Sequence, residues 1–400
     1  MNQARPGVQA GALTEDLARV PLVDHHCHSL QDDWTGLSDG PAWRRCFTTS
    51  HSPAVLADGV PNLLGFQRFL VTLAAELDLP HTGPADSKLE ARLRARRDEL
   101  TGADAVGYLR RLLDGAGIST LLVDTGFGGA EVLSLAALRD VAGRPVREVV
   151  RVEPVAEAII RSGGRSTLSP EGFGEALEAG LRRELAGGAV ALKSVLAYRV
   201  GLALRRPGPA EVRHALREVG PRAQGVRLHD PVLTAFAVWR AAELAAELEV
   251  PVQFHTGFGD ADLQLPETDP TLLRELLRDP RTEGCHIVLL HCYPFVRQAA
   301  YLAGLYPQVW MDLSLAIPLA EPAASRLVAE ALALCPVTKL LAASDGYSYP
   351  EMHWWAAIVW RRALAEALGP EVNAGRLDRA AAVEFAGLVL AGNATRLYRL

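Results

Sequence analysis

Short apolar segments alternate with longer amphipathic segments along most of the chain. Eight of the short segments are predicted to be strands, and most of them are nearly continuous in Val, Ile and Leu, which is typical of strands that are covered by helices on both faces. These segments span residues 21–27, 120–125, 146–152, 189–196, 252–255, 286–291, 308–313 and 339–344. Stretches such as 231–248 and 294–305 lie between them and have the composition of helices. The alternation predicts an α/β fold in which eight parallel strands close into a (β/α)8 TIM barrel.

One interval interrupts this alternation. From residue 29 to about residue 105 the sequence contains no strand-like segment, whereas 66–79 and 88–100 have the pattern of helices. Long connections within a compact domain usually carry a structure or a function of their own. We therefore predict a barrel domain formed by residues 1–28 and 106–400, and a helical insertion at 29–105 that could serve as a lid over the barrel.

Composition narrows the class of protein. Of the 400 residues, 49% are apolar and 22% are charged, as in soluble globular proteins. The formal net charge of −6 argues against a nucleic acid or an anionic membrane as the main partner, and no uncharged apolar run approaches the roughly 20 residues of a membrane span. The N-terminal segment lacks the pattern of a signal peptide, and the five cysteines form no CxxC pair. We expect a cytoplasmic protein that binds a small molecule and could form a homo-oligomer.

The most specific local signal is the segment Asp24-His25-His26-Cys27-His28. Because side chains alternate along a strand, His26 and His28 are expected to share one face, and His25 and Cys27 the other. Asp24 would lie on the face of His26 and orient its ring from below. Two imidazoles at one strand end can bind a divalent metal such as zinc. Imidazoles are also ordinary hydrogen-bonding groups, so this pair alone leaves both interpretations open.

Three further polar residues directly follow apolar strand segments. His255 ends the fifth predicted strand, His291 ends the sixth, and Asp345 follows the eighth. In barrel enzymes the active site lies at the carboxyl ends of the strands and draws its residues from several of them. Together with His26 and His28, these positions predict one metal centre.

Lys193 lies in the fourth predicted strand and has three interpretations. It could be a structural cation in a salt bridge, or a cation that holds an anionic substrate. It could also react with CO2 to form a carbamate that bridges two metal ions. The carbamate requires a deprotonated amine, which burial and nearby positive charge favour by lowering the pKa of a lysine. The residues alone leave these three alternatives open.

The order of these residues resembles the amidohydrolase superfamily of metal-dependent barrel enzymes. That superfamily has HxH on strand one, in some members Lys on strand four, His on strands five and six, and Asp on strand eight. The match extends from Leu22 to Asp345. The stretches VALKSVLAYRVGL, PVQFHTGFGDADLQL and SDGYSYPE are similar to a branch that includes the domain fused to glutamine-synthetase-like proteins, with uronate isomerases more distant. The resemblance implies one or two divalent metal ions, with zinc preferred.

A ligand set follows from this resemblance. The core ligands would be His26, His28, His255 and Asp345, with Lys193 and His291 as conditional ligands. A bound metal makes water nucleophilic near neutral pH. Asp345 would then act as a catalytic residue that accepts the proton of the water and delivers it to the leaving group. His291 or Lys193 would stabilise the negative charge on the attacked carbonyl oxygen.

Four residues near the predicted strand ends are candidates for binding the substrate. Tyr198 and Arg199 follow the fourth strand, and Tyr293 and Arg297 follow His291. An arginine at the mouth of the barrel could hold a carboxylate through two parallel hydrogen bonds. A surface salt bridge is an equal alternative for such a residue.

These residues predict a metal-dependent hydrolase that cleaves an amide-type C–N bond of a small, carboxylate-bearing substrate. The carboxylate, and a γ-glutamyl type of substrate, rest on the association with glutamine-synthetase-like proteins alone, which is an analogy. The alternatives are a decarboxylase or a uronate-isomerase-like enzyme of the same superfamily, and a metal-binding scaffold without catalysis.

Overall fold

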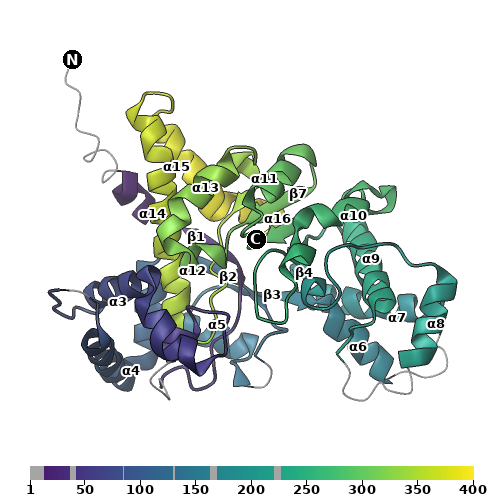
Figure 1. Cartoon of the computed structure of the whole chain (residues 1–400), viewed down its shortest axis with the longest axis horizontal. Coiled ribbons are helices and arrows are strands. Elements are labelled where there is room, and N and C mark those ends of the chain that lie inside the picture. Colours follow the sequence, from purple (N-terminus) through teal and green to yellow (C-terminus); the bar gives the residue numbers. More distant parts are fainter. Residues whose placement is uncertain (1–12, 37–41, 84, 129–130, 163–168, 220–226) are drawn as a thin grey trace.

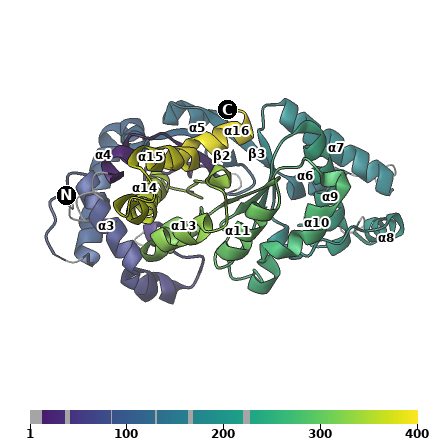
Figure 2. The same ribbon diagram turned by 90° about the horizontal axis from the view of Figure 1, so that it is seen from above.

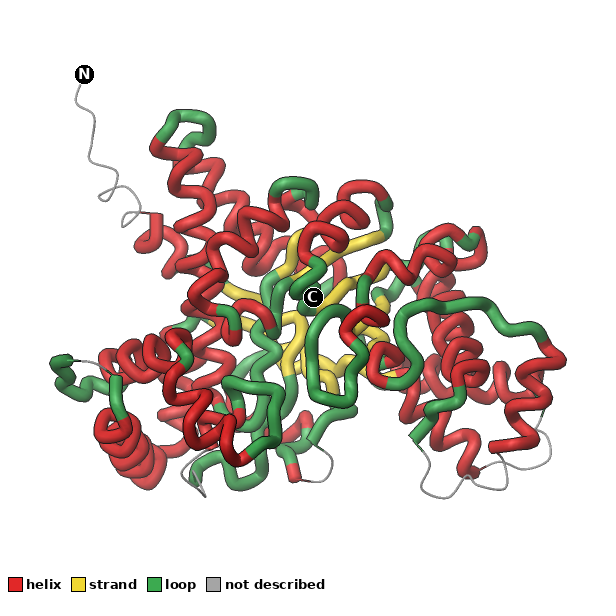
Figure 3. Tube along the Cα trace, viewed as in Figure 1, coloured by secondary structure: helices red, strands yellow, loops and turns green. Residues whose placement is uncertain are grey.

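The computed structural model describes residues 13–36, 42–83, 85–128, 131–162, 169–219 and 227–400. Eight parallel strands form one sheet in the order β1-β2-β3-β4-β5-β6-β7-β8, and Figure 3 shows this sheet at the centre of the molecule with helices around it. The strands are β1 Leu22–Cys27, β2 Ile118–Asp124, β3 Val146–Arg151, β4 Ala191–Ser194, β5 Val252–His255, β6 Ile287–Leu290, β7 Val309–Asp312 and β8 Leu340–Leu341. Each overlaps the segment predicted from the apolar pattern, so the predicted strands are confirmed.

The barrel closes through the chain that follows β8. Asp345 N donates to the carbonyl oxygen of His26 at 3.0 Å. His28 N donates to the carbonyl oxygen of Gly346 at 2.8 Å. These bonds join the last strand to the first and confirm the (β/α)8 barrel. They also bring Asp345 beside the two histidines of the first strand.

Helices cover the outside of this sheet. The α-helices are α2 Ala42–Arg45, α3 Leu64–Glu76, α4 Ser87–Gly115, α5 Leu135–Ala142, α6 Val152–Ser162, α7 Pro170–Ala186, α8 Pro209–Val219, α9 Pro231–Leu248, α10 Arg274–Arg278, α11 Val296–Leu305, α12 Ala316–Leu319, α13 Ala324–Leu332, α14 Pro350–Asn373, α15 Arg379–Gly387 and α16 Asn393–Tyr398. Helices α3 and α4 lie on one side of the barrel near α14, and α6 to α9 lie on the opposite side (Figures 1 and 2). Among the described helices, none combines the length and the apolar character that a membrane span needs.

Local signals explain where two of the longer helices begin. Asp86 and Asp230 directly precede α4 and α9, and each accepts a hydrogen bond from a backbone N–H three residues later. These donors are Leu89 N at 2.9 Å and Leu233 N at 2.8 Å. Pro231 takes the first position of α9, where its missing N–H would have no partner within the helix. The observed helix α9 thus has the bounds predicted from the sequence, residues 231–248.

Buried contacts fasten the predicted helical insertion to the barrel. Arg97 of α4 is fully buried and forms an ion pair with Glu351 in the first turn of α14. Its guanidinium also donates to the carbonyl oxygens of Trp34 at 2.6 Å and Thr35 at 2.8 Å. Helix α4 continues past the predicted boundary at residue 105, with a non-helical backbone at Asp104. The insertion is thus continuous with the barrel at its end and is bound to it by a buried charge pair.

The C-terminal helix α16 covers the amino-terminal end of the barrel. Leu397 and Tyr398 pack with the apolar side chains that point into the barrel, among them Leu122. Asn393 donates to the carbonyl oxygen of Leu340, at the start of β8, at 2.8 Å. Helix α16 therefore lies against the central sheet (Figures 1 and 2), on the side opposite the strand ends that carry the predicted ligands.

Candidate metal centre

Strand β1 carries a bulge near its carboxyl end. Asp24 pairs with Leu121 of β2, and Cys27 pairs with Val123. Between these two pairs β1 advances by three residues and β2 by two. The extra residue on β1 interrupts the alternation of its side chains. As a result His26 still points into the barrel, but its neighbours no longer follow the simple two-face pattern.

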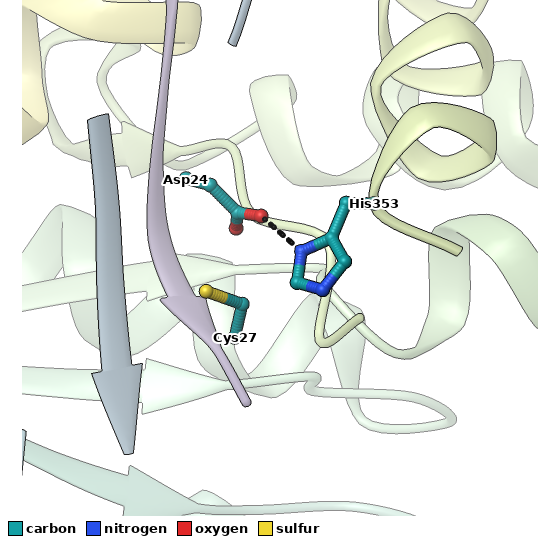
Figure 4. Close-up of side chains that lie close together, drawn as sticks. All are labelled: Asp24, Cys27 and His353. Carbon is teal, nitrogen blue, oxygen red and sulfur yellow. Dashed lines mark hydrogen bonds and ion pairs between the residues drawn. The ribbon is translucent and has the colours of Figure 1, made fainter. Parts of the chain in front are cut away.

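Asp24 lies on the outer side of β1, so the prediction that it orients His26 is wrong. Its Oδ1 accepts from Ser344 N at 2.8 Å, and its Oδ2 lies 3.4 Å from Nδ1 of His353 on α14. Cys27 is the third member of this group (Figure 4), but burial raises the pKa of its thiol well above the ordinary value. Because a protonated thiol is a poor metal ligand, this group joins β1 to α14 through hydrogen bonds.

The tautomer of His26 is fixed by Gln253 of β5. The Nε2 of Gln253 donates to the carbonyl oxygen of His25 and to Oη of Tyr398, both at 2.9 Å. Its Oε1 therefore faces Nδ1 of His26, at 3.0 Å. Since an amide oxygen only accepts, Nδ1 of His26 carries the proton and Nε2 presents a lone pair. Burial, together with the charge of Lys193, lowers the pKa of His26 to about 4 and keeps the ring neutral at pH 7.

His28 is held in the same tautomer, and its free nitrogen meets that of His26. Its Nδ1 lies 3.2 Å from the carbonyl oxygen of Asp124, so in the neutral ring Nε2 is left with a lone pair. The Nε2 atoms of His26 and His28 lie 3.1 and 3.3 Å from the same atom, Oδ1 of Asp345. Among the described residues this buried oxygen has no hydrogen-bond donor. Three lone-pair atoms at such distances repel unless a cation lies between them, so these residues fit a divalent metal.

Two of the strand-end residues have strained backbones. His291 and Asp345 have φ angles of 67° and 51°, in the left-handed region that residues other than glycine rarely adopt. Hydrogen bonds hold both conformations. His291 N donates to Oδ1 of Asp312 at 2.5 Å, and Asp345 N donates to the carbonyl oxygen of His26. Such strain is typical of functional sites, where it aims a side chain that relaxed geometry would turn away.

His255 and His291 lie side by side but differ in tautomer. Their ring centroids are 4.5 Å apart, and the His291 ring is 5.5 Å from that of His26. Nε2 of His255 lies 3.2 Å from the carbonyl oxygen of Phe258, so its Nδ1 keeps a lone pair for a metal. Nδ1 of His291 lies 2.8 Å from Oγ of Ser314, whose hydroxyl donates to Oδ1 of Asp312, so Nδ1 of His291 donates to Ser314 and its Nε2 keeps a lone pair. His291 therefore joins His26 and Asp345 as a candidate metal ligand.

Lys193 is buried beside these histidines. Its Nζ lies 3.3 Å from Nε2 of His26 and 3.9 Å from Oδ2 of Asp124. Burial lowers the pKa of Lys193 to about 8, although the charge of Asp124 opposes this shift. Burial alone would raise the pKa of Asp124, but the Arg151 guanidinium, 2.8 Å away, outweighs it and holds that pKa below its usual value. A cation and a reactive amine both fit this setting for Lys193.

A cavity of about 1040 Å³ contains the centre. The predicted ligands and catalytic residues that line it are His26, His28, Lys193, His255, His291 and Asp345. Tyr198 also lines the cavity, and its ring lies 4.5 Å from that of His255. The structure thus brings together all of the predicted metal and catalytic residues and one predicted substrate residue.

The other predicted substrate residues do not reach this cavity. Arg199 pairs with Glu157 of α6 at 3.2 Å. The side chain of Arg297 is 78% exposed and pairs with Glu330 of α13 at 3.2 Å. Tyr293 is 36% exposed and is not part of the cavity wall. The three residues follow the expected strands, but their side chains turn towards neighbouring helices or solvent.

Sequence reasoning missed much of the cavity wall. Arg44, Arg45 and Arg94 reach the cavity from the insertion, and Arg151 and Arg227 reach it from the barrel. The chain contains many arginines, so no local signal distinguishes these five. It also missed Gln253, whose signal was a polar residue inside the apolar segment before His255.

Known proteins share this architecture and sequence. The family model for amidohydrolases matches residues 151–400, more than half of the chain. Protein fluG of Emericella nidulans is 28% identical over 412 residues. That match covers 95% of this chain but 46% of fluG, so the chain spans about half the length of this curated relative.

Solved structures also resemble this chain. A protein from Lactobacillus casei, assigned as a metal-dependent hydrolase, has 29% identity and a TM-score of 0.82, with 97% of each chain covered. A uronate isomerase from Thermotoga maritima has a TM-score of 0.70 at 14% identity, covering 98% of this chain and 97% of its own, and this likeness shows the fold alone. On the match over residues 151–400, the chain belongs to the amidohydrolase family, whose use of a divalent metal agrees with the converging histidines and Asp345.

Proposed function

We propose that the protein hydrolyses an amide-type C–N bond of a small, carboxylate-bearing substrate, with zinc as the metal. Membership of the amidohydrolase family supports a hydrolase. The observation that carries the proposal is the convergence of Nε2 of His26 and His28 on Oδ1 of Asp345, at 3.1 and 3.3 Å. Imidazole nitrogens and a carboxylate oxygen are typical ligands of catalytic zinc.

The residues around this point have separable roles. A zinc ion held by His26, His28, Asp345 and Nδ1 of His255 would make water nucleophilic near neutral pH and polarise a carbonyl. Asp345 accepts the proton of the attacking water and passes it to the leaving amine. His291 would be a further ligand of the same ion, so the negative charge on the attacked oxygen would be stabilised by the metal and by Lys193. Lys193, at 3.3 Å from His26, adds positive charge to the same region.

The cavity wall supports an anionic substrate of modest size. A volume of about 1040 Å³ suits a small molecule and its solvent better than a polymer. Five arginines line it, of which Arg44 pairs with Glu90 and Arg151 with Asp124; the others are Arg45, Arg94 and Arg227. Guanidinium groups bind carboxylates through paired N–H donors, which favours substrates that carry a carboxylate. Phe127, 41% exposed with its ring 4.6 Å from that of His28, offers an apolar contact beside the metal.

The test is a hydrolysis screen on the purified full-length chain with γ-glutamyl and other carboxylate-bearing amides. We expect release of an amine or ammonia, loss of that release after treatment with a chelator, and its return with zinc. His26→Ala should abolish turnover, whereas His214→Ala, on the exposed face of α8, should leave it unchanged. Release of CO2 or of an isomeric sugar would replace this proposal with the decarboxylase or the isomerase. Tight zinc binding without turnover of any of these substrates would favour the scaffold.

A further inference from the structure

A layer of polar side chains lies beneath the candidate metal centre, inside the barrel. Oδ2 of Asp312 lies 3.0 Å from Nε2 of His25, and Nδ1 of His25 lies 3.0 Å from Oη of Tyr398. Nε2 of Gln253 donates to the same hydroxyl at 2.9 Å, and Oε1 of Gln253 faces Nδ1 of His26 at 3.0 Å. A continuous chain of polar contacts thus runs from β7, through helix α16, to a candidate metal ligand on β1.

Packing does not explain the polar character of this layer. Tyr398 is 3% exposed, and the other four side chains are fully buried. Their neighbours in the barrel interior, such as Leu122 and Val288, are apolar. Burying a polar group costs free energy unless it is hydrogen-bonded, so an apolar layer would be simpler to form. A phenylalanine at position 398 would fill nearly the same volume, which leaves the hydroxyl in need of another explanation.

The hydroxyl of Tyr398 and the carbonyl oxygen of His25 together determine the direction of the Gln253 amide. Nε2 of His25 lies at an ion-pair distance from the Asp312 carboxylate, without hydrogen-bond geometry, and this negative charge favours the proton of a neutral His25 on Nε2. Nδ1 of His25 then accepts from the Tyr398 hydroxyl. Burial raises the pKa of Tyr398 far above its ordinary value, so this proton is retained. The hydroxyl oxygen is then an acceptor for Nε2 of Gln253. With its N–H groups committed to Tyr398 and to the carbonyl oxygen of His25, Gln253 can offer only its oxygen to His26.

We propose that Tyr398 of the C-terminal helix is a positioning residue for the metal centre. Through Gln253, it holds His26 with the proton on Nδ1 and the lone pair of Nε2 directed at Asp345. The inference rests on the proposed metal-dependent function, because His26 acts here as a metal ligand. It assigns to helix α16, at the amino-terminal end of the barrel, a role in the chemistry at the opposite end.

The test measures zinc affinity of the full-length protein by competition with a chelator of known affinity. Groups that orient a metal-bound histidine typically contribute 10–100-fold to metal affinity. We expect Tyr398→Phe to weaken zinc binding about 10-fold, and Gln253→Leu to weaken it about 100-fold. Tyr108→Phe is the matched control: it removes another buried tyrosine hydroxyl, which donates to Glu351 at 2.7 Å and so belongs to a different set of contacts. Its zinc affinity should equal that of the wild type.

A double variant separates positioning from packing. If Tyr398 acts through Gln253, then Tyr398→Phe should change zinc affinity no further once Gln253→Leu is present. Effects that multiply, or a Tyr398→Phe protein that binds zinc as the wild type does, would overturn the proposal. If Tyr398→Phe does not fold, Gln253→Leu decides, because unchanged zinc affinity in that variant also overturns it. Since the readout is zinc affinity, failure to find an amide substrate would refute the proposed reaction and leave this inference standing.

Discussion

Replacing Asp345 with asparagine should affect the metal-free protein and its metal binding in opposite directions. In the wild type, the lone pairs of His26 and His28 face Oδ1 of Asp345 at 3.1 and 3.3 Å, and among the described residues no donor reaches that oxygen. Nζ of Lys193 lies 3.3 Å from Nε2 of His26. Asparagine has the same shape as aspartate and also tolerates the left-handed backbone at this position, where φ is 51°. Its Nδ2 would place two N–H donors where the carboxylate oxygen was. Each imidazole nitrogen would then receive a hydrogen bond.

The size of this effect follows from the unpaired acceptor. A buried acceptor without a partner costs about 1–3 kcal/mol, so Asp345→Asn should raise the free energy of unfolding of the metal-free protein by roughly that amount. At about 2.1 cal/mol/K per residue, the unfolding entropy of this chain is about 0.8 kcal/mol/K, which converts the gain into about 1–4 °C in Tm. Zinc binding loses its carboxylate ligand. Groups that orient a ligand without touching the metal contribute up to about 100-fold to metal affinity. Asp345 is itself a proposed ligand, so we expect zinc affinity to fall by more than that.

Thermal unfolding in excess chelator measures the first effect, and a zinc titration measures the second. Asp312→Asn is the matched control, because Asp312 is also buried at a strand end, but its Oδ1 accepts from the backbone N–H groups of His291 and Ser314. Its Oδ2 lies 3.0 Å from Nε2 of His25. In one orientation the amide introduced at position 312 would point its N–H groups at the backbone N–H groups of His291 and Ser314, and in the other at His25. Asp312→Asn should therefore lower Tm. A metal-free Asp345→Asn protein that melts below the wild type would show that the histidines present N–H groups here, and the metal-site assignment would fall.

Two further variants test how the site is built. A Cβ at Gly259 would lie 2.0 Å from Oη of Tyr198, so Gly259→Ala should lower both Tm and zinc affinity. Adding Tyr198→Phe removes the nearest atom and should recover part of both losses. Arg97→Met leaves the Glu351 carboxylate buried without its cation and should lower the free energy of unfolding by about 3–5 kcal/mol in urea titrations, whereas Arg96→Met, in a partly exposed ion pair on the same helix, should change it by less than about 1 kcal/mol.

The strands could be predicted from the sequence because a strand that is buried on both faces consists mainly of consecutive apolar residues. Each strand is a short apolar run, and in a barrel the residue after such a run lies at the active-site end. This reasoning located His255, His291 and Asp345 without any knowledge of pairing. It failed at Asp24, because the bulge in β1 exists only in the pairing with β2, and one extra residue turns a side chain to the other face.

The substrate side of the site could not be read in the same way. Arg199 and Arg297 follow the expected strands, but Glu157 and Glu330 on neighbouring helices hold them, and those contacts depend on helix packing. Arg44 and Arg94 line the cavity from helices that lie far from the strands in sequence. A barrel strand has a fixed end, whereas a helical insertion can meet the barrel in many ways. Ligands on strands are therefore easier to predict than a wall supplied by an insertion.

The attachment of that insertion bears on how the cavity admits its substrate. A lid formed by residues 29–105 that opens as a unit would carry Trp34 and Thr35 along with Arg97, but it would have to separate Arg97 from Glu351 of α14. If either charge stayed buried after this separation, the cost would be about 3–5 kcal/mol, and the open state would be less than 1% populated. Trp34 itself is only 4% exposed, so opening would also expose apolar surface. We therefore expect the insertion to act as a fixed wall of the proposed substrate site, at the strand ends that carry the candidate ligands.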